Sequence, residues 1–263
     1  MNATVATQMA GADFLKLRKK RGTLIWALVL ALAPLLIFFI VRAVQHSSNP
    51  LKYEVAGGTH GYTDAVRLLT MFFGPLAAIL IGTESGAGDA ASGVFRDLVV
   101  TGRSRVGLFA SRVPAALGLC WLVVLVGYGL TVLGTYAFAG SSATPEGALL
   151  LNGLGFSLLA TGVVCVVAVG FASLTASRPA ALTALIGWHL VASPILANIS
   201  SLGGARRLIL SQAVAHFSPV DLGDRGGHGT TVTMSGAVGV IVLAGWLVAF
   251  LALGAWRTRT MDA

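Results

Sequence analysis

Long stretches without a charged residue are the feature that most constrains how this chain can fold. Residues 22–41 form one such stretch, between Arg21 and Arg42, and residues 113–145 and 147–177 are equally free of charge. A helix needs about 20 mostly apolar residues to cross the hydrocarbon core of a membrane. These stretches therefore predict transmembrane helices.

The overall composition agrees with a membrane protein. Of the 263 residues, 56% are hydrophobic and 11% are charged, whereas a soluble domain carries about 25% charged residues. Disordered chains are poor in apolar residues, so this composition excludes them as well. We predict an all-α, polytopic fold with one transmembrane domain over residues 23–256. Its six spans are predicted at about 23–43, 66–87, 113–139, 149–175, 180–200 and 234–256.

The two ends of the chain are predicted to lie outside the membrane. Residues 1–22 combine apolar side chains such as Phe14 and Leu17 with a run of basic residues, which is typical of an amphipathic helix at a membrane interface. The first apolar run has 20 residues, longer than the 7–15 of a signal peptide, so we expect a retained span. Residues 257–263 form a short tail.

Basic residues predict the orientation. With both termini in the cytoplasm, twelve of the 18 Lys and Arg residues lie on the cytoplasmic side, as the positive-inside rule requires. This asymmetry explains the net charge of +8 without any nucleic-acid partner. We expect a multi-pass protein of the plasma (inner) membrane. Arginine exceeds lysine, and alanine and glycine are abundant, which favours a GC-rich, bacterial genome.

The chain lacks the common catalytic and metal-binding motifs. No lysine follows a glycine, so the phosphate-binding motif G-x-x-x-x-G-K-[ST] cannot occur. The motifs H-E-x-x-H and G-x-S-x-G are also absent. Cys120 and Cys165 lie inside apolar runs, where cysteine behaves as a small buried side chain. We therefore predict no enzyme activity, no metal site and no cofactor within this chain.

The predicted cytoplasmic segment 89–112 carries the most informative pattern. Leu98, Val99 and Val100 are three consecutive apolar residues in an otherwise polar loop. Exposed apolar residues of this kind mark a contact surface, and a short helix that carries them can enter a groove on a soluble partner. The alternative is an ordinary loop whose valines pack back against the bilayer.

This segment fits the pattern G-x-x-R-x-L-x-x-[TP]-x-x-[SR]-R through Gly93, Arg96, Leu98, Thr101, Ser104 and Arg105. In this pattern, and in its basic N-terminal helix, its six spans and a short outer helix expected at 205–217, the chain resembles the membrane subunit of a type-2 ABC exporter. The family often has a Glu-rich sequence before the glycine, where this chain has Asp89. The resemblance implies a cytoplasmic coupling helix that docks on a separate ATPase. Its residues would be Arg96, Asp97, Leu98, Val99, Val100, Thr101, Gly102, Arg103, Ser104 and Arg105.

The resemblance also implies a function. The chain would be a permease subunit whose energy comes from ATP and Mg²⁺ on the partner ATPase. It would work with a second copy or a related permease among membrane lipids, and would export a hydrophobic or amphipathic compound such as a drug, an antibiotic or a lipid. The alternative is an ion-coupled secondary transporter or a channel, which usually needs several acidic groups at mid-membrane.

Three polar residues in or near the spans are candidates for a transport pathway or gate, because polar groups at membrane depth are often functional. Glu84, at the inner end of the second span, either forms an ion pair with Arg96 or Arg105, acts as a gate, or simply lies at the lipid headgroups. Asp89 is the acidic residue of the coupling segment. His189, near the middle of the fifth span, either lines the substrate path or hydrogen-bonds a neighbouring helix.

Overall fold

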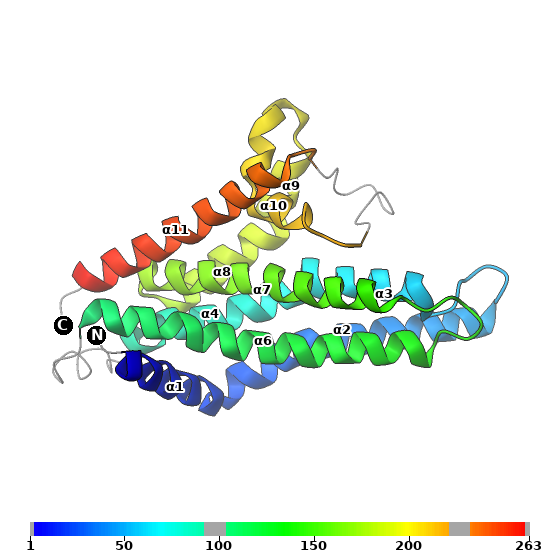
Figure 1. The fold of residues 1–263 in the computed structure, drawn as a ribbon, viewed down its shortest axis with the longest axis horizontal. Helices are drawn as coiled ribbons and strands as arrows, with labels where there is room; N and C mark the ends of the chain where they lie inside the picture. The colour runs from blue at the N-terminus through cyan, green and yellow to red at the C-terminus, as the bar shows by residue number, and fades with distance from the viewer. Residues whose placement is uncertain (1–2, 92–103, 221–231, 261–263) are drawn as a thin grey trace.

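The computed structural model describes residues 3–91, 104–220 and 232–260, and these residues form helices joined by turns and loops (Figure 1). Six of the described helices are long and apolar enough to cross a membrane, which confirms the predicted all-α, polytopic fold. The elements are α1 (Ala3–Lys19), α2 (Arg21–Ser48), α3 (Gly58–Arg67), η1 (Leu68–Phe73), α4 (Gly74–Ala91), α6 (Arg105–Ala137), α7 (Gly147–Thr175), α8 (Arg178–Gly187), η2 (Trp188–Ala192), α9 (Ser193–Asn198), η3 (Ser200–Leu208), α10 (Leu210–Ala215) and α11 (Gly236–Thr260).

Two of the helices extend beyond the predicted apolar spans. The second spanning helix begins at Gly58 rather than at 66, and the third begins at Arg105 rather than at 113. A helix can continue into polar sequence because its backbone hydrogen bonds do not depend on the side chains. The apolar residues mark only the part of the helix that is surrounded by lipid or protein. Ser104 begins the third helix as an N-cap, because its Oγ accepts a hydrogen bond from the Gly107 amide at 3.1 Å.

Two spanning helices contain a wider, π-helical turn. In the second span η1 lies between α3 and α4, and in the fifth span η2 lies between α8 and α9. Pro75 and Pro194 come directly after these turns, as the second residues of α4 and α9. Proline has no N–H and removes a backbone hydrogen bond from the helix. The two prolines therefore account for the position of the irregular turns.

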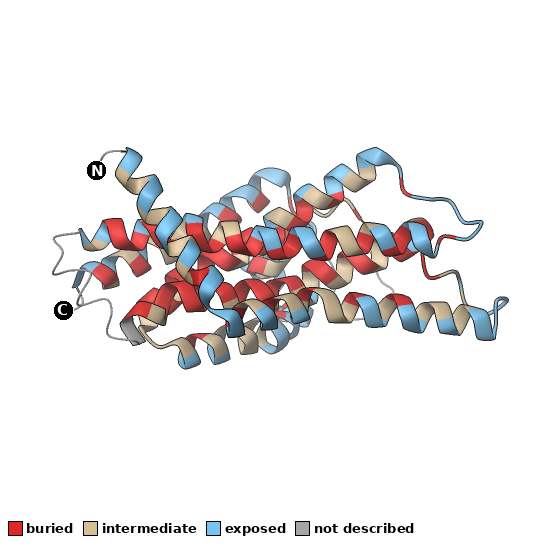
Figure 2. Ribbon diagram, turned by 90° about the horizontal axis from the view of Figure 1, so that it is seen from below, coloured by how far each residue is buried: buried red, intermediate tan, exposed pale blue. Residues whose placement is uncertain are grey.

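The interior is formed by close helix packing around α4 and α7 (Figure 2). An added Cβ at Gly82 would lie 2.7 Å from the Cys165 carbonyl oxygen, and one at Gly86 would lie 2.5 Å from that of Val169. Small residues at such positions let helix backbones approach closely. Glycine therefore fixes the α4–α7 contact.

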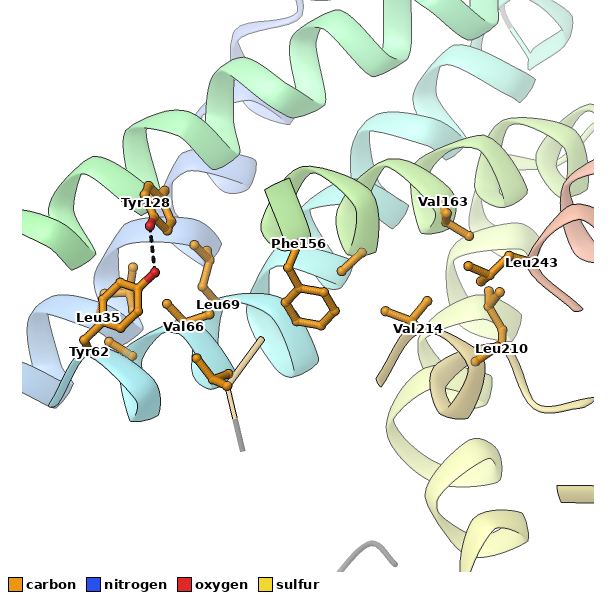
Figure 3. Packing of buried hydrophobic residues seen from close by; sticks show 14 of the residues in the cluster. Leu35, Tyr62, Val66, Leu69, Tyr128, Phe156, Val163, Leu210, Val214 and Leu243 are labelled. Carbon is orange, nitrogen blue, oxygen red and sulfur yellow. Dashed lines mark hydrogen bonds between the residues drawn. The ribbon is translucent and has the colours of Figure 1, made fainter. Parts of the chain in front are cut away.

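The far end of the bundle is held by two buried tyrosines, from α3 and α6. The Tyr62 and Tyr128 hydroxyl oxygens lie 2.7 Å apart and face each other in Figure 3. At the start of α7 the Tyr128 hydroxyl donates to the Leu150 carbonyl at 2.5 Å, so the single proton of Tyr62 is shared between Tyr128 and the Leu149 carbonyl, which lies 3.1 Å away. Buried hydroxyls need such partners, so three helices meet here without an unpaired group.

The N-terminal helix α1 packs on the protein itself. Leu17 is buried, and the Phe14 ring lies against Gly118 of α6. In Figure 1 α1 lies at the same end of the molecule as the end of α11. The predicted outer helix at 205–217 corresponds to the second half of η3 and to α10. The predicted coupling helix at 96–105 lies mostly outside the described residues.

Candidate functional site

Six charged side chains meet where α1, α4, α6 and α8 come together, and we refer to them as the charge cluster. The members are Lys16, Lys20, Glu84, Asp89, Arg112 and Arg178. The two carboxylates both belong to α4, and the four cations come from the other three helices or their flanking residues. The charge cluster therefore connects α1, α6 and α8 to the end of α4, which carries both carboxylates.

Glu84 forms the first half of the cluster. Its carboxylate accepts from Arg178 Nη1 at 2.9 Å and from Lys20 Nζ at 3.3 Å, and the Thr23 hydroxyl donates to it at 3.2 Å. Arg178 Nη2 also donates to Thr23 Oγ1, at 3.3 Å. The Glu84 side chain is 4% exposed, so these partners replace the water that a carboxylate otherwise requires.

Local sequence places Arg178 at this point. Ala176 ends α7 in a left-handed conformation with φ 52°, and Pro179 occupies the first turn of α8. Proline is favoured in a first turn because its missing N–H is not needed there. The turn between α7 and α8 is therefore very short, and it sets Arg178 beside the end of α4.

Asp89 forms the second half of the cluster. Arg112 Nη2 donates to its Oδ2 at 3.2 Å, and Lys16 pairs with its Oδ1. The Asp89 and Arg112 side chains are each 5% exposed. Arg112 Nη1 also donates to the Gly86 carbonyl, at 3.3 Å. The end of α4 and the first turns of α6 are thus tied by both side chain and backbone.

Neutral hydrogen bonds surround the charges. The Ser85 hydroxyl donates to the Arg112 carbonyl and the Ser173 hydroxyl to the Gly86 carbonyl, both at 3.2 Å. On α1, Asp13 accepts from the Ser111 hydroxyl at 2.6 Å. Burial lowers the pKa of the Lys16 ammonium, and the nearby Asp13 carboxylate opposes that shift.

Buried charges are strongly unfavourable unless they are paired and hydrogen-bonded. The charge cluster satisfies this requirement by sharing each carboxylate between two cations. Any movement of α4 relative to α1, α6 or α8 has to exchange these partners. The charge cluster can therefore couple the positions of α1, α4, α6 and α8. This coupling requires no catalytic group. Within the described parts of the chain, His, Cys, Asp and Glu form no group of three or more that could hold a metal ion.

The structure brings together two of the predicted residues, Glu84 and Asp89. The ion pairs of Glu84 go to Lys20 and Arg178 rather than to Arg105, and its carboxylate is buried in protein. Arg105 instead donates to the Arg259 carbonyl at 3.4 Å, and Ser104 caps α6. The other predicted coupling residues, 96–103, lie outside the described residues.

His189 lies apart from the charge cluster, in η2. Its Nε2–H donates to the Met71 carbonyl of η1 at 3.0 Å, so it forms the helix-to-helix hydrogen bond that was one of the two alternatives. It also lines a half-open cavity together with Met71. The two alternatives for this residue are therefore compatible.

Sequence reasoning missed the four cations as partners of α4. Lys16, Lys20, Arg112 and Arg178 were counted only as positive charges near the membrane surface. A usable signal was present, because the predicted second span ends in two acidic residues and basic residues stand beside the predicted ends of three other helices. Opposite charges at the same predicted depth indicate pairing.

Comparison with known proteins gives one family. A model described as "ABC-2 family transporter protein" matches residues 11–188, which is more than half of the chain. The match includes the second half of α1, the charge cluster and the first four spanning helices, and extends through α8. No curated protein matches the chain.

Proposed function

This chain belongs to the ABC-2 transporter family, and on that premise we propose that it is the permease subunit of an ATP-driven exporter. A separate ATP-binding subunit supplies ATP and Mg²⁺, and residues 96–105 dock on it. The cargo is a hydrophobic or amphipathic compound such as a drug, an antibiotic or a lipid. The subunit lies in the plasma membrane with both termini in the cytoplasm, and it pairs with a second copy or a related permease.

The charge cluster is the observation that carries this proposal. Asp89 and Arg112 flank the proposed docking residues in the sequence, and they pair with each other at 3.2 Å. Glu84, one and a half turns before Asp89 on α4, is bonded to Arg178 of α8. A load applied between α4 and α6 is therefore passed to α1 and α8 through ion pairs whose carboxylates are buried and whose cations are partly exposed.

This arrangement suits a two-state mechanism. ATP binding would draw two ATPase subunits together and displace the docking residues. The spanning helices would then shift between two arrangements, each with its own set of ion-pair partners. Such a shift needs only a difference in binding free energy between the two states. The chemistry takes place on the partner.

The docking step is tested by co-purification. The chain is expressed with the ATP-binding protein encoded beside it, and Leu98→Asp and Val99→Asp are expected to abolish its recovery with the permease. Leu51→Asp is the matched control, because Leu51 is fully exposed in the α2–α3 connection, at the end of the molecule away from α1 and the charge cluster. Recovery of the ATPase at full yield with the double variant would contradict docking through these residues.

The transmission step needs a different variant. Arg178→Met removes one partner of Glu84 and leaves Lys20 and Thr23 in place, so the fold is expected to survive. We expect the ATPase to bind at wild-type yield and to hydrolyse ATP, while ATP-dependent transport in vesicles falls at least tenfold. Wild-type transport by this variant would show that the charge cluster does not transmit the movement.

An ion-coupled transporter is the alternative function. The acidic residues of the described spanning helices lie toward helix ends, with Asp64 near one end of its span and Glu84 and Asp89 near the other. Ion-coupled carriers place acidic groups near mid-membrane, so the positions favour the ATP-driven reading. Uphill transport by the isolated chain, driven only by a proton or sodium gradient, would establish the alternative.

A further inference from the structure

A half-open cavity of about 340 Å³ lies among the helices of this single subunit, away from the charge cluster. It is bounded by the second, fourth, fifth and sixth spanning helices together with α10. Its wall includes Met71, Val164, His189 and Trp246, each near the middle of its own spanning helix. The cavity therefore lies at the depth of the hydrocarbon core rather than at either surface.

The wall is apolar and rich in aromatic rings. No Asp, Glu, Lys or Arg is among the described residues that line it. Trp246 stacks on Phe250 with ring centroids 5.5 Å apart, and Trp188 lies 6.1 Å from Trp246. Rigid rings held by one another keep a cavity open and offer flat faces to a ligand.

A few polar groups interrupt this wall. His189 Nε2–H donates to the Met71 carbonyl, which Pro75 cannot reach because it has no N–H. In the neutral imidazole, a proton on Nε2 leaves Nδ1 as an acceptor. Ser193 and Ser211 share a hydrogen bond of 2.6 Å at another point of the wall. Apolar cavities with a few placed polar groups are typical of small-molecule sites.

Both π-helical turns of the described chain border this cavity. Met71 of η1 and His189 of η2 join them directly, so the irregular parts of the second and fifth spans meet at one place. Figure 3 shows Leu210 and Val214, which line the cavity from α10, turned toward the α7 side of the molecule. Single π-helical turns occur frequently at functional sites.

We propose that this cavity binds an uncharged lipophilic molecule within one subunit. The volume lies within the range of small-molecule sites, about 300–1,000 Å³. The absence of charged side chains from its described wall disfavours an ionised ligand, because a charge there would stay unpaired. The occupant is either exported cargo, which rests on the proposed function, or a neutral membrane lipid, which does not.

The test uses two photoreactive probes that differ only in charge, a diazirine-labelled decanol and the corresponding decanoate. The full-length permease alone, in lipid nanodiscs, is irradiated with each probe, and labelled peptides are identified by mass spectrometry. We expect decanol to label α7 and α11 peptides that line the cavity, and decanoate to label them at least fivefold less. Equal labelling by both probes would overturn the charge selectivity.

Two cavity-filling variants localise the labelling. Val164→Phe and Ala184→Phe are expected to reduce decanol labelling at least fivefold, because each adds a ring at the wall. Val248→Phe is the matched control on an exposed face of α11, and it should label as the wild type does. Ala184 is an exposed residue at the rim of the cavity, so a larger side chain is tolerated there. If Val164→Phe does not fold, Ala184→Phe is the variant that tests the site. Unchanged labelling in a folded cavity variant refutes the site.

The source of the ligand is then decided separately. A resident lipid appears in native mass spectra of the purified wild type and is lost from Ala184→Phe, whereas cargo binding appears as ATP-dependent transport that falls in the same variant. Either result supports the site. If the labelling is as expected but the permease transports nothing together with its ATPase, the proposed function is rejected. The binding site in the cavity is still supported in that case.

Discussion

The Arg112 guanidinium lies 3.2 Å from the Asp89 carboxylate, and both side chains are 5% exposed. This pair joins the end of α4 to the start of α6, and Lys16 adds α1 to it. A buried ion pair contributes to the free energy of folding in two opposite ways. Loss of hydration of the two charges opposes folding, and their mutual attraction favours it. Their value to the protein is specific helix placement, because two side chains that are almost fully buried depend on each other for charge compensation.

Removal of the carboxylate should therefore destabilise the protein. Asp89→Asn removes the carboxylate that Arg112 and Lys16 share, and broken buried pairs cost about 3–5 kcal/mol. Thermal unfolding of the purified chain in detergent should show a midpoint several degrees lower. Asp64→Asn is the control, because the Arg42–Asp64 pair has 29% exposed side chains and a distance of 3.6 Å. An equal effect of both changes would mean that burial does not decide the outcome.

The α4–α7 contact should not tolerate a methyl group. Gly86→Ala places its Cβ 2.5 Å from the Val169 carbonyl oxygen, so the two helices must separate. Gly129→Ala, in α6, meets no atom within 4 Å and is expected to be neutral or stabilising by about 0.5–1 kcal/mol. The unfolding midpoint should fall for Gly86→Ala and should stay unchanged or rise for Gly129→Ala. A Gly86→Ala protein as stable as the wild type would contradict the close contact.

Gly153 and Tyr62 should show non-additive effects. A Cβ at Gly153 would overlap the Tyr62 hydroxyl, so Gly153→Ala alone is strongly unfavourable. Tyr62→Phe alone breaks the hydrogen bond to Tyr128 and costs about 1–3 kcal/mol. The double variant removes the overlapping oxygen and should be more stable than Gly153→Ala. If the two losses simply add, the clash is not with the hydroxyl.

The His189–Met71 hydrogen bond should depend on Pro75. His189→Leu leaves the Met71 carbonyl without its side-chain donor, at about 1–3 kcal/mol. Pro75→Ala supplies a backbone N–H four residues after Met71, so the same histidine change should then be nearly neutral. The unfolding midpoints of the four proteins form a double-mutant cycle. An equal loss in both backgrounds would indicate that His189 acts through packing instead.

The six spanning helices could be predicted from the sequence because a long run of uncharged, apolar residues has to be buried in lipid or in protein. The run at 22–41 became α2, which confirms a spanning helix there. The start of the third helix at Arg105 could not be found in this way, since its first two turns carry basic residues. Apolarity is required only inside the membrane, whereas backbone hydrogen bonding extends beyond it.

The candidate site was predictable only in part. Glu84 and Asp89 stood out as acidic residues at the end of a span, but the choice of partner depends on which helices are neighbours. That choice is made by contacts such as the glycines of α4 against α7, whose pairing the sequence does not state. The cavity beside His189 was equally hidden, because Val164, Trp188 and Trp246 come together only in three dimensions.

The order of synthesis gives the charge cluster a further significance. Lys16 and Lys20 leave the ribosome before the carboxylates of α4 exist, and Arg178 emerges only after the fourth spanning helix is complete. Glu84 and Asp89 must therefore enter the translocation machinery while part of their final neutralisation is still missing. The charge cluster itself is complete only when α8 arrives, so a nascent chain that stops before residue 178 lacks one of the two cations that pair with Glu84.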